Sequence, residues 1–172
     1  DMEEGARNAR RFHDAGFPFQ LGGMFPETLD LLAFGRGLMN FYVDIYEYGD
    51  EILEILNIML EEFENEWGPR VKSAVDSAAE RGEKVFYAVQ PGVQAHCNLV
   101  SRDVFEKFAW PSYKRQAELV IKNGGYVYFH MDCNWTGFLD FFKDFPKGRC
   151  LFDTDGFTDL EKVRDTLSGT MG

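Results

Sequence analysis

The feature that most constrains this chain is a strand-then-helix order that repeats three times in its second half. Short apolar segments typical of strands cover residues 84–90, 126–130 and 149–152, and helical segments follow at 102–122, 138–142 and 158–167. Strands that are apolar throughout, without polar alternation, indicate parallel strands buried on both faces. Helices between them supply the crossovers that parallel pairing requires. We therefore expect the three strands to lie parallel and adjacent, in chain order, in one sheet.

The first half of the chain is predicted to be mostly helical. Residues 1–15 and the long stretch 26–81 carry apolar side chains at helical spacing, and a short apolar run at 17–21 predicts an early strand. Gly68-Pro69 predicts a bend or break within the second stretch. We interpret the chain as one domain, with a helical region and one strand in 1–83 and successive β-α units in 84–172.

Two parallel architectures fit this order, a doubly wound sheet and a (β/α)8 barrel. Neither GxGxxG nor GxxxxGK[ST] follows any predicted strand, which weakens the case for a nucleotide-binding doubly wound sheet. A closed barrel has eight strands, whereas the sequence predicts four, and the chain ends where another strand is due. We therefore expect an α/β fold of the TIM-barrel type, with this chain a fragment that carries about half of the barrel.

Charge and cysteine content exclude some classes of partner. The formal net charge of −11 disfavours nucleic acid and anionic membrane surfaces, which attract clustered Lys and Arg. No stretch approaches the ~20 apolar residues that span a bilayer, and the first residues do not resemble a signal peptide. Three widely spaced cysteines, Cys97, Cys133 and Cys150, favour a reducing compartment. These features predict a cytoplasmic protein without nucleic-acid or membrane partners.

Polar side chains follow each of the three strands, where function gathers in parallel architectures. Because the carboxyl ends of parallel strands meet at one edge of the sheet, we expect these groups to share one cleft. The groups are His96, Cys97 and Asn98 after the first strand, His130, Asp132, Cys133 and Asn134 after the second, and Asp153 and Asp155 after the third. The candidate catalytic residues are His130, Asp132 and Asp153, and His96 and Asn134 are candidate substrate-binding residues.

The segment HMDCN at 130–134 has two interpretations. Imidazole, carboxylate and thiolate are ligands that Zn²⁺ accepts, so His130, Asp132 and Cys133 are candidate metal ligands, with Cys97 or His96 joining from the neighbouring strand. Alternatively the segment is a polar turn, in which Asp132 or Asn134 caps the following helix and Cys133 is a small buried thiol.

Two further features also have alternative interpretations. Asp153 and Asp155 are either paired carboxylates, one with a raised pKa, or turn formers before Gly156. Asp153 is the stronger functional candidate because it lies at the strand end. Arg36, between glycines in FGRG, is either a substrate-binding residue for a carboxylate or phosphate, or a solvated loop residue.

Several segments together resemble the uroporphyrinogen decarboxylase superfamily. Leu99-Val100-Ser101, Phe105 and the stretch from Trp110 to Lys114 resemble its "L-S-P…F…P-Y-K" segment. YVYFH followed by MDCN is similar to the His-bearing strand end of its methyltransferase-like branch. FGRG with Asp44 downstream resembles its "RG…D" region, and RCLFDTDG with DLEKVRDTL resembles the next strand and helix. The resemblance covers nearly the whole chain, in order.

The resemblance implies a (β/α)8 barrel enzyme whose cleft lies at the carboxyl ends of the strands. For the methyltransferase-like branch it implies a zinc ion, held by His and Cys, that activates a thiol to take a methyl group from a corrinoid. His130 matches the zinc histidine. The branch has H-x-C, whereas here Asp132 holds that place and Cys133 follows it. The cysteine that completes such sites is expected beyond residue 172.

The resemblance leaves two alternatives to zinc-assisted methyl transfer. One is uroporphyrinogen decarboxylase, acting on tetrapyrrole side chains in porphyrin biosynthesis, although its arginine-rich loop and catalytic aspartate are not visible in this sequence. The other is a barrel homologue that binds a ligand without catalysis. The expected partner is a small molecule or a corrinoid protein, with zinc as cofactor and the corrinoid as substrate or as a group borne by the partner.

Overall fold

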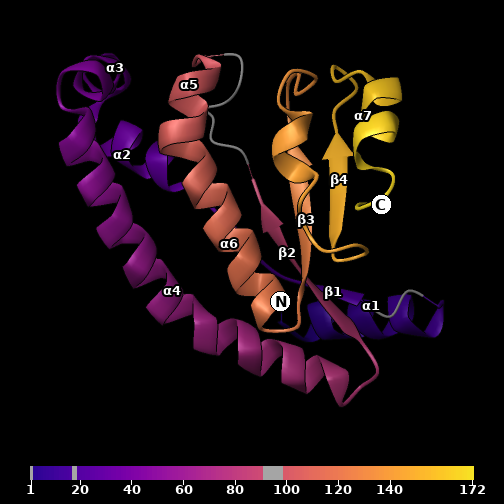
Figure 1. Ribbon diagram of the computed structural model, residues 1–172. Helices are drawn as coiled ribbons and strands as arrows, with labels where there is room; N and C mark the ends of the chain where they lie inside the picture. The colour runs from indigo at the N-terminus through magenta and orange to yellow at the C-terminus, as the bar shows by residue number, and fades with distance from the viewer. Residues whose placement is uncertain (1, 17–18, 91–98) are drawn as a thin grey trace.

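Four parallel strands form one sheet in the order β1-β2-β3-β4. The computed structural model describes residues 2–16, 19–90 and 99–172 (Figure 1). The strands are β1 (Phe19–Phe25), β2 (Lys84–Val89), β3 (Tyr126–Met131) and β4 (Cys150–Thr154). The three strands of the second half are parallel and adjacent in chain order, as the sequence predicts.

Strand β1 extends beyond the predicted segment at 17–21, because Gly22 and Gly23 belong to the strand. The register between β1 and β2 shifts between Leu21 and Gly23. A Cβ atom on Gly22 would lie 2.5 Å from the Tyr87 ring, so only glycine allows this close approach of β1 to β2. The glycines therefore mark an irregularity within the strand instead of its end.

Seven α-helices, one π-helix and one 3₁₀ helix are present in the described residues. They are α1 (Met2–Asp14), α2 (Thr28–Arg36), α3 (Leu38–Glu47), α4 (Gly49–Ala79), α5 (Arg102–Val104), the π-helix η1 (Phe105–Ala109), α6 (Trp110–Lys122), the 3₁₀ helix η2 (Leu139–Phe142) and α7 (Leu160–Leu167). Helix α4 continues through Pro69 and bends along its length (Figure 1), so the predicted bend is present and the chain does not break there.

The helical stretch that precedes β3 is divided just before Pro111. Ser101 caps α5 by accepting a hydrogen bond from the amide of Val104, and the π-helix η1 separates α5 from α6. Proline has no amide hydrogen to continue the α-helical bonding pattern, and a π turn is one way to absorb that loss. Phe105, the first residue of η1, belongs to an aromatic cluster with Tyr113, Trp135 and Phe138.

Helices α4 and α6 cover one face of the sheet. Helices α4 and α6 contact β2, and α6 also contacts β3. On β3 the alternate residues Val127, Phe129 and Met131 are fully buried, whereas Tyr126, Tyr128 and His130 are only partly buried. The expectation that the strands are buried on both faces therefore does not hold for β3, whereas β2 is buried on both faces at Tyr87, Ala88 and Val89. Four strands form an open sheet, and closure is what buries the second face of a barrel.

The second face carries an apolar depression. Its lining residues are Leu21, Phe86, Tyr128 and Leu151, with one side chain from each strand. At the outer edge of β4, Gly172 donates its amide hydrogen to Cys150 and accepts one from Phe152, which are the bonds of a parallel neighbour. The architecture is thus α/β with an open parallel sheet. None of the helices in the described part of the chain combines the length and apolar character needed to cross a bilayer.

Candidate functional site

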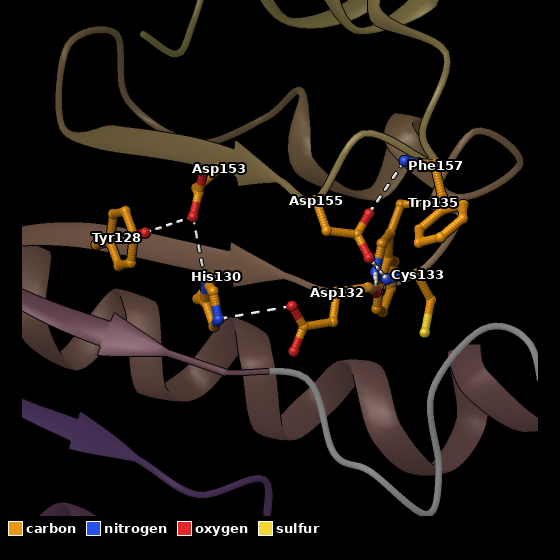
Figure 2. A network of polar contacts seen from close by, with 8 residues as sticks. All are labelled: Tyr128, His130, Asp132, Cys133, Trp135, Asp153, Asp155 and Phe157. Atoms are coloured by element: carbon orange, nitrogen blue, oxygen red, sulfur yellow. Dashed lines mark hydrogen bonds and ion pairs between the residues drawn. The ribbon is translucent and has the colours of Figure 1, made fainter.

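A network of polar side chains lies at the carboxyl ends of β3 and β4 (Figure 2). His130 Nδ1 lies 3.1 Å from Asp153 Oδ2, and His130 Nε2 lies 3.6 Å from Asp132 Oδ1. The Tyr128 hydroxyl donates a hydrogen bond to the same oxygen of Asp153. We call Tyr128, His130, Asp132 and Asp153 the strand-end network. It joins the three residues that the sequence nominated as catalytic.

The strand geometry explains why these residues meet. Tyr128 and His130 are two positions apart on β3, so their side chains leave the same face of the sheet. In the parallel register His130 is the partner of Asp153, so the two side chains also share that face. The network is open to solvent, since the exposed fractions of the side chains are 36% for His130 and 43% for Asp153.

Asp153 is an ionised carboxylate at neutral pH. The hydrogen bond from Tyr128, followed by the one from His130, holds the pKa of Asp153 below its ordinary value. The same contact with Asp153 raises the pKa of Tyr128 to about 12, with burial as a smaller cause. Tyr128 is therefore a neutral donor, and Asp153 accepts from both neighbours.

This charge state determines the tautomer of His130. An ionised carboxylate only accepts hydrogen bonds, so the ring nitrogen that faces Asp153 must carry the hydrogen. In the neutral imidazole, Nε2 then holds the lone pair. Two electron-pair donors, Nε2 and the carboxylate of Asp132, consequently face each other at 3.6 Å. A proton or a metal cation between them satisfies both.

Cys133 does not join this pair of donors. Its side chain points away from His130 in Figure 2, and its backbone has φ of 73°, in the left-handed region that favours glycine. Among residues 2–16, 19–90 and 99–172 there is no group of three His, Cys, Asp or Glu side chains placed to hold a metal ion. Of the proposed ligand set, the structure thus brings together His130 and Asp132 but not Cys133.

The conformation of the segment after β3 is held by the segment after β4. Asp155 accepts hydrogen bonds from the amides of Cys133, at 2.7 Å, and Phe157, at 3.1 Å. The Thr158 hydroxyl accepts from the amide of Trp135 and donates to the carbonyl of Cys133. The turn interpretation of Asp155 is therefore confirmed, and its contacts also connect the two segments.

The alternative capping role for Asp132 or Asn134 is not seen. Helix η2 follows Phe138 without a side-chain cap, whereas Asn134 accepts a hydrogen bond from the Thr136 amide within a turn. The position of Asp132 depends instead on Trp135. Its indole nitrogen donates to the carbonyl of Asp132 at 2.6 Å, and its ring is fully buried among aromatic side chains.

The remaining candidates lie apart from the network or outside the described residues. Arg36 ends α2 and forms an ion pair with Asp44, at 2.5 Å from Nε to Oδ2, with 59% of its side chain exposed. His96 and Cys97 are not among the described residues. Sequence reasoning missed Tyr128, whose signal was its position two residues before His130 on the same strand.

No protein-family model, curated protein or solved structure matches this chain.

Proposed function

We propose that this chain is part of a barrel enzyme of the uroporphyrinogen decarboxylase superfamily that moves a methyl group between a corrinoid and a thiol. Two features support the proposal. The resembling segments occur in the expected order along nearly the whole sequence. The four parallel strands, in chain order and with helices on one face, are compatible with an arc of a (β/α)8 barrel.

The observation that carries the proposal is the orientation of His130. Histidine ligands of metal ions donate their second ring nitrogen to a carboxylate or carbonyl, which fixes the tautomer and strengthens the ligand. Asp153 is placed to accept from Nδ1 in this way, and Nε2 faces the carboxylate of Asp132 at 3.6 Å. This pair of donors opens to solvent at the edge of the sheet where parallel α/β proteins bind their substrates.

The donors fit a zinc ion in part. His130 Nε2 and Asp132 are ligand types that zinc accepts, and a third ligand would come from outside the described residues, with His96 and Cys97 as the candidates in this sequence. Carboxylate in place of thiolate makes the site harder and weakens its preference for a soft metal. Bound zinc would supply Lewis acidity that converts a thiol into a thiolate nucleophile.

The charge of the site favours methyl transfer over decarboxylation of a tetrapyrrole. A substrate with several carboxylate side chains needs cationic partners. The described strand ends instead present the carboxylates of Asp132, Asp153 and Asp155, and Arg36 is paired with Asp44.

Zinc content tests the site. We expect about one zinc per molecule of the full-length protein, lost in His130→Ala and reduced in Asp132→Asn, because one intact site requires its ligands. His13→Ala removes an exposed histidine of α1, and Cys133→Ser removes the thiol that points away from the pair. Both variants should keep the zinc. Equal and negligible zinc in wild type and His130→Ala would end the zinc hypothesis.

Activity tests the reaction. Methylcobalamin and a small thiol, incubated with the protein, should yield the methyl thioether and demethylated cobalamin, and His130→Ala should abolish the reaction. Release of CO₂ from uroporphyrinogen would instead favour the decarboxylase. Absence of both reactions, with retained ligand binding, would favour the non-catalytic homologue.

A further inference from the structure

A second set of polar groups is buried where α2 begins, just after the carboxyl end of β1. We call it the buried polar joint. It consists of Glu27, Thr28 and Asp30 at the start of α2 and of Ser112 and Gln116 on α6. Their exposed fractions run from 0% for Ser112 to 6% for Asp30, so solvent does not reach these groups.

Hydrogen bonds across the joint hold α2 against α6. The Thr28 amide donates to the Ser112 hydroxyl at 3.2 Å, and the hydroxyls of the two residues lie 2.8 Å apart. Gln116 donates from Nε2 to the carbonyl of Pro26 at 2.8 Å. Within α2, Glu27 is the N-cap residue, because its Oε2 accepts from the amide of Asp30 at 2.9 Å.

Two acceptor atoms of the joint lack a hydrogen bond of standard geometry. They are Oε1 of Glu27 and Oε1 of Gln116, and both are buried. A buried carboxylate without a donor on one oxygen carries a large desolvation cost. A proton on that oxygen removes the charge and converts the unpaired acceptor into a hydroxyl donor.

The surroundings of Glu27 favour this proton. Burial is the largest cause that raises the pKa of Glu27 from 4.5 to about 8, and the negative charge of Asp30 adds to it. The amides of Leu29 and Asp30 and the Ser112 hydroxyl act in the opposite direction. Burial, and after it the negative charge of Asp30, also raise the pKa of Tyr42 on α3. Asp30 is the one charged side chain that acts on Glu27 among the described residues.

We propose that Glu27 is carried in the folded protein as the neutral carboxylic acid and that its proton keeps the start of α2 fastened to α6. Alkaline pH removes the proton, leaves a buried carboxylate beside Asp30, and loosens α2. The joint is thus an alkaline-sensitive latch at the edge of the sheet that also carries the strand-end network. This inference does not depend on the proposed methyl transfer.

The sign of the pH effect follows from the raised pKa. The unfolded chain loses the Glu27 proton near pH 4.5, whereas the folded chain keeps it until about pH 8. Between these values the unfolded state binds fewer protons, so stability falls as pH rises. The contribution of Glu27 to the unfolding constant increases up to about tenfold for each pH unit, and it levels off above the folded pKa.

Glu27→Gln is the variant that tests the latch. Glutamine is neutral at every pH and keeps an oxygen that can accept from the Asp30 amide. We expect the variant to gain stability over wild type as pH rises from 5 to 9. Glu51→Gln, at an exposed carboxylate in the first turn of α4, is the matched control and should keep the pH dependence of wild type.

Two measurements decide the matter. Above pH 8, hydrogen exchange at the amides of α2 should accelerate in wild type, after correction for the intrinsic rate, but not in Glu27→Gln. Infrared spectra of the wild-type protein should contain a neutral carboxylic acid band at pH 6.5 that disappears by pH 9. This measurement does not require the variant to fold. Absence of that band, or parallel pH profiles for wild type and Glu27→Gln, would overturn the latch.

Discussion

Asp153 and Glu27 are both carboxylic acids near the carboxyl end of a strand, and their surroundings shift their pKa values in opposite directions. Asp153 keeps 43% of its side chain exposed and accepts hydrogen bonds from Tyr128 and His130, which lower its pKa. Glu27 is 2% exposed, and its burial raises its pKa to about 8. The same functional group is therefore a fixed negative charge in the strand-end network and a neutral acid in the buried polar joint.

The comparison shows that access to water and the charge of the neighbours decide the state of each acid. At the edge of the sheet, the Tyr128 hydroxyl, the His130 ring and solvent support the charge of Asp153. Inside the joint, Glu27 lies near another carboxylate, Asp30, and the neighbouring amides and the Ser112 hydroxyl do not offset the loss of water. A site that binds a cation needs the first situation, and a pH-sensitive contact needs the second.

The largest expected effect concerns Trp135, the buried side chain that holds the Asp132 backbone of the strand-end network. Trp135→Ala should lower the free energy of unfolding by roughly 3–5 kcal/mol, because a fully buried indole leaves a cavity. It should also release the Asp132 carbonyl from its hydrogen bond. Denaturant unfolding measures the loss, and Phe157→Ala, at a side chain that is 73% exposed, is the control. A loss below about 1 kcal/mol would mean that the network does not depend on this support.

The next effect concerns the joint itself. Ser112→Ala removes the hydroxyl that accepts from the Thr28 amide and contacts the Thr28 side chain. Because these groups are buried, we expect a loss of about 1–3 kcal/mol in denaturant unfolding. Ser168→Ala, at an exposed position after α7, should stay within about 0.5 kcal/mol of wild type. Equal effects from the two serines would contradict the role of the joint.

A smaller effect is expected where Asp155 connects the segments after β3 and β4. Asp155→Ala removes an acceptor for the amides of Cys133 and Phe157 and should cost about 1 kcal/mol, as the loss of a side-chain cap does. Asp165→Ala is the control, because Asp165 is exposed and forms an ion pair with its exposed neighbour Arg164. Thermal unfolding of both variants measures the difference, and an unchanged midpoint for Asp155→Ala would argue against the connection.

The smallest effect concerns the charge of Asp153. Its lowered pKa contributes stability that is present above the unfolded value of 3.8 and is lost as pH falls through the folded value. Because the side chain is partly exposed, the contribution is below about 1 kcal/mol. Tyr128→Phe should raise the pKa of Asp153 toward its ordinary value, as followed by NMR titration of the carboxyl carbon. Tyr126→Phe, two residues earlier on β3, should leave that pKa unchanged.

Much of the sheet and part of the candidate site could be predicted from the sequence. Apolar runs separated by helices indicated β2, β3 and β4 and their parallel order, because those signals are local. Placing His130 and Asp153 after neighbouring strands also implied that they meet, since parallel strands end at one edge. The glycines of β1 misled the prediction of its end, because their role depends on the approach of Tyr87 from another strand.

What the sequence by itself determined is therefore the order of the elements, the parallel sense of the sheet and the edge at which polar groups gather. Only the tertiary structure decided that Tyr128 binds Asp153, that Cys133 turns away from His130, and that Glu27 is buried against α6. The hydrogen bonds on either side of Glu27 join Pro26 and Thr28 to residues of α6 that lie 84 or more positions later in the chain. Local patterns follow from backbone geometry over a few residues, whereas burial and hydrogen-bond partners depend on the register and packing of elements that are distant in the chain.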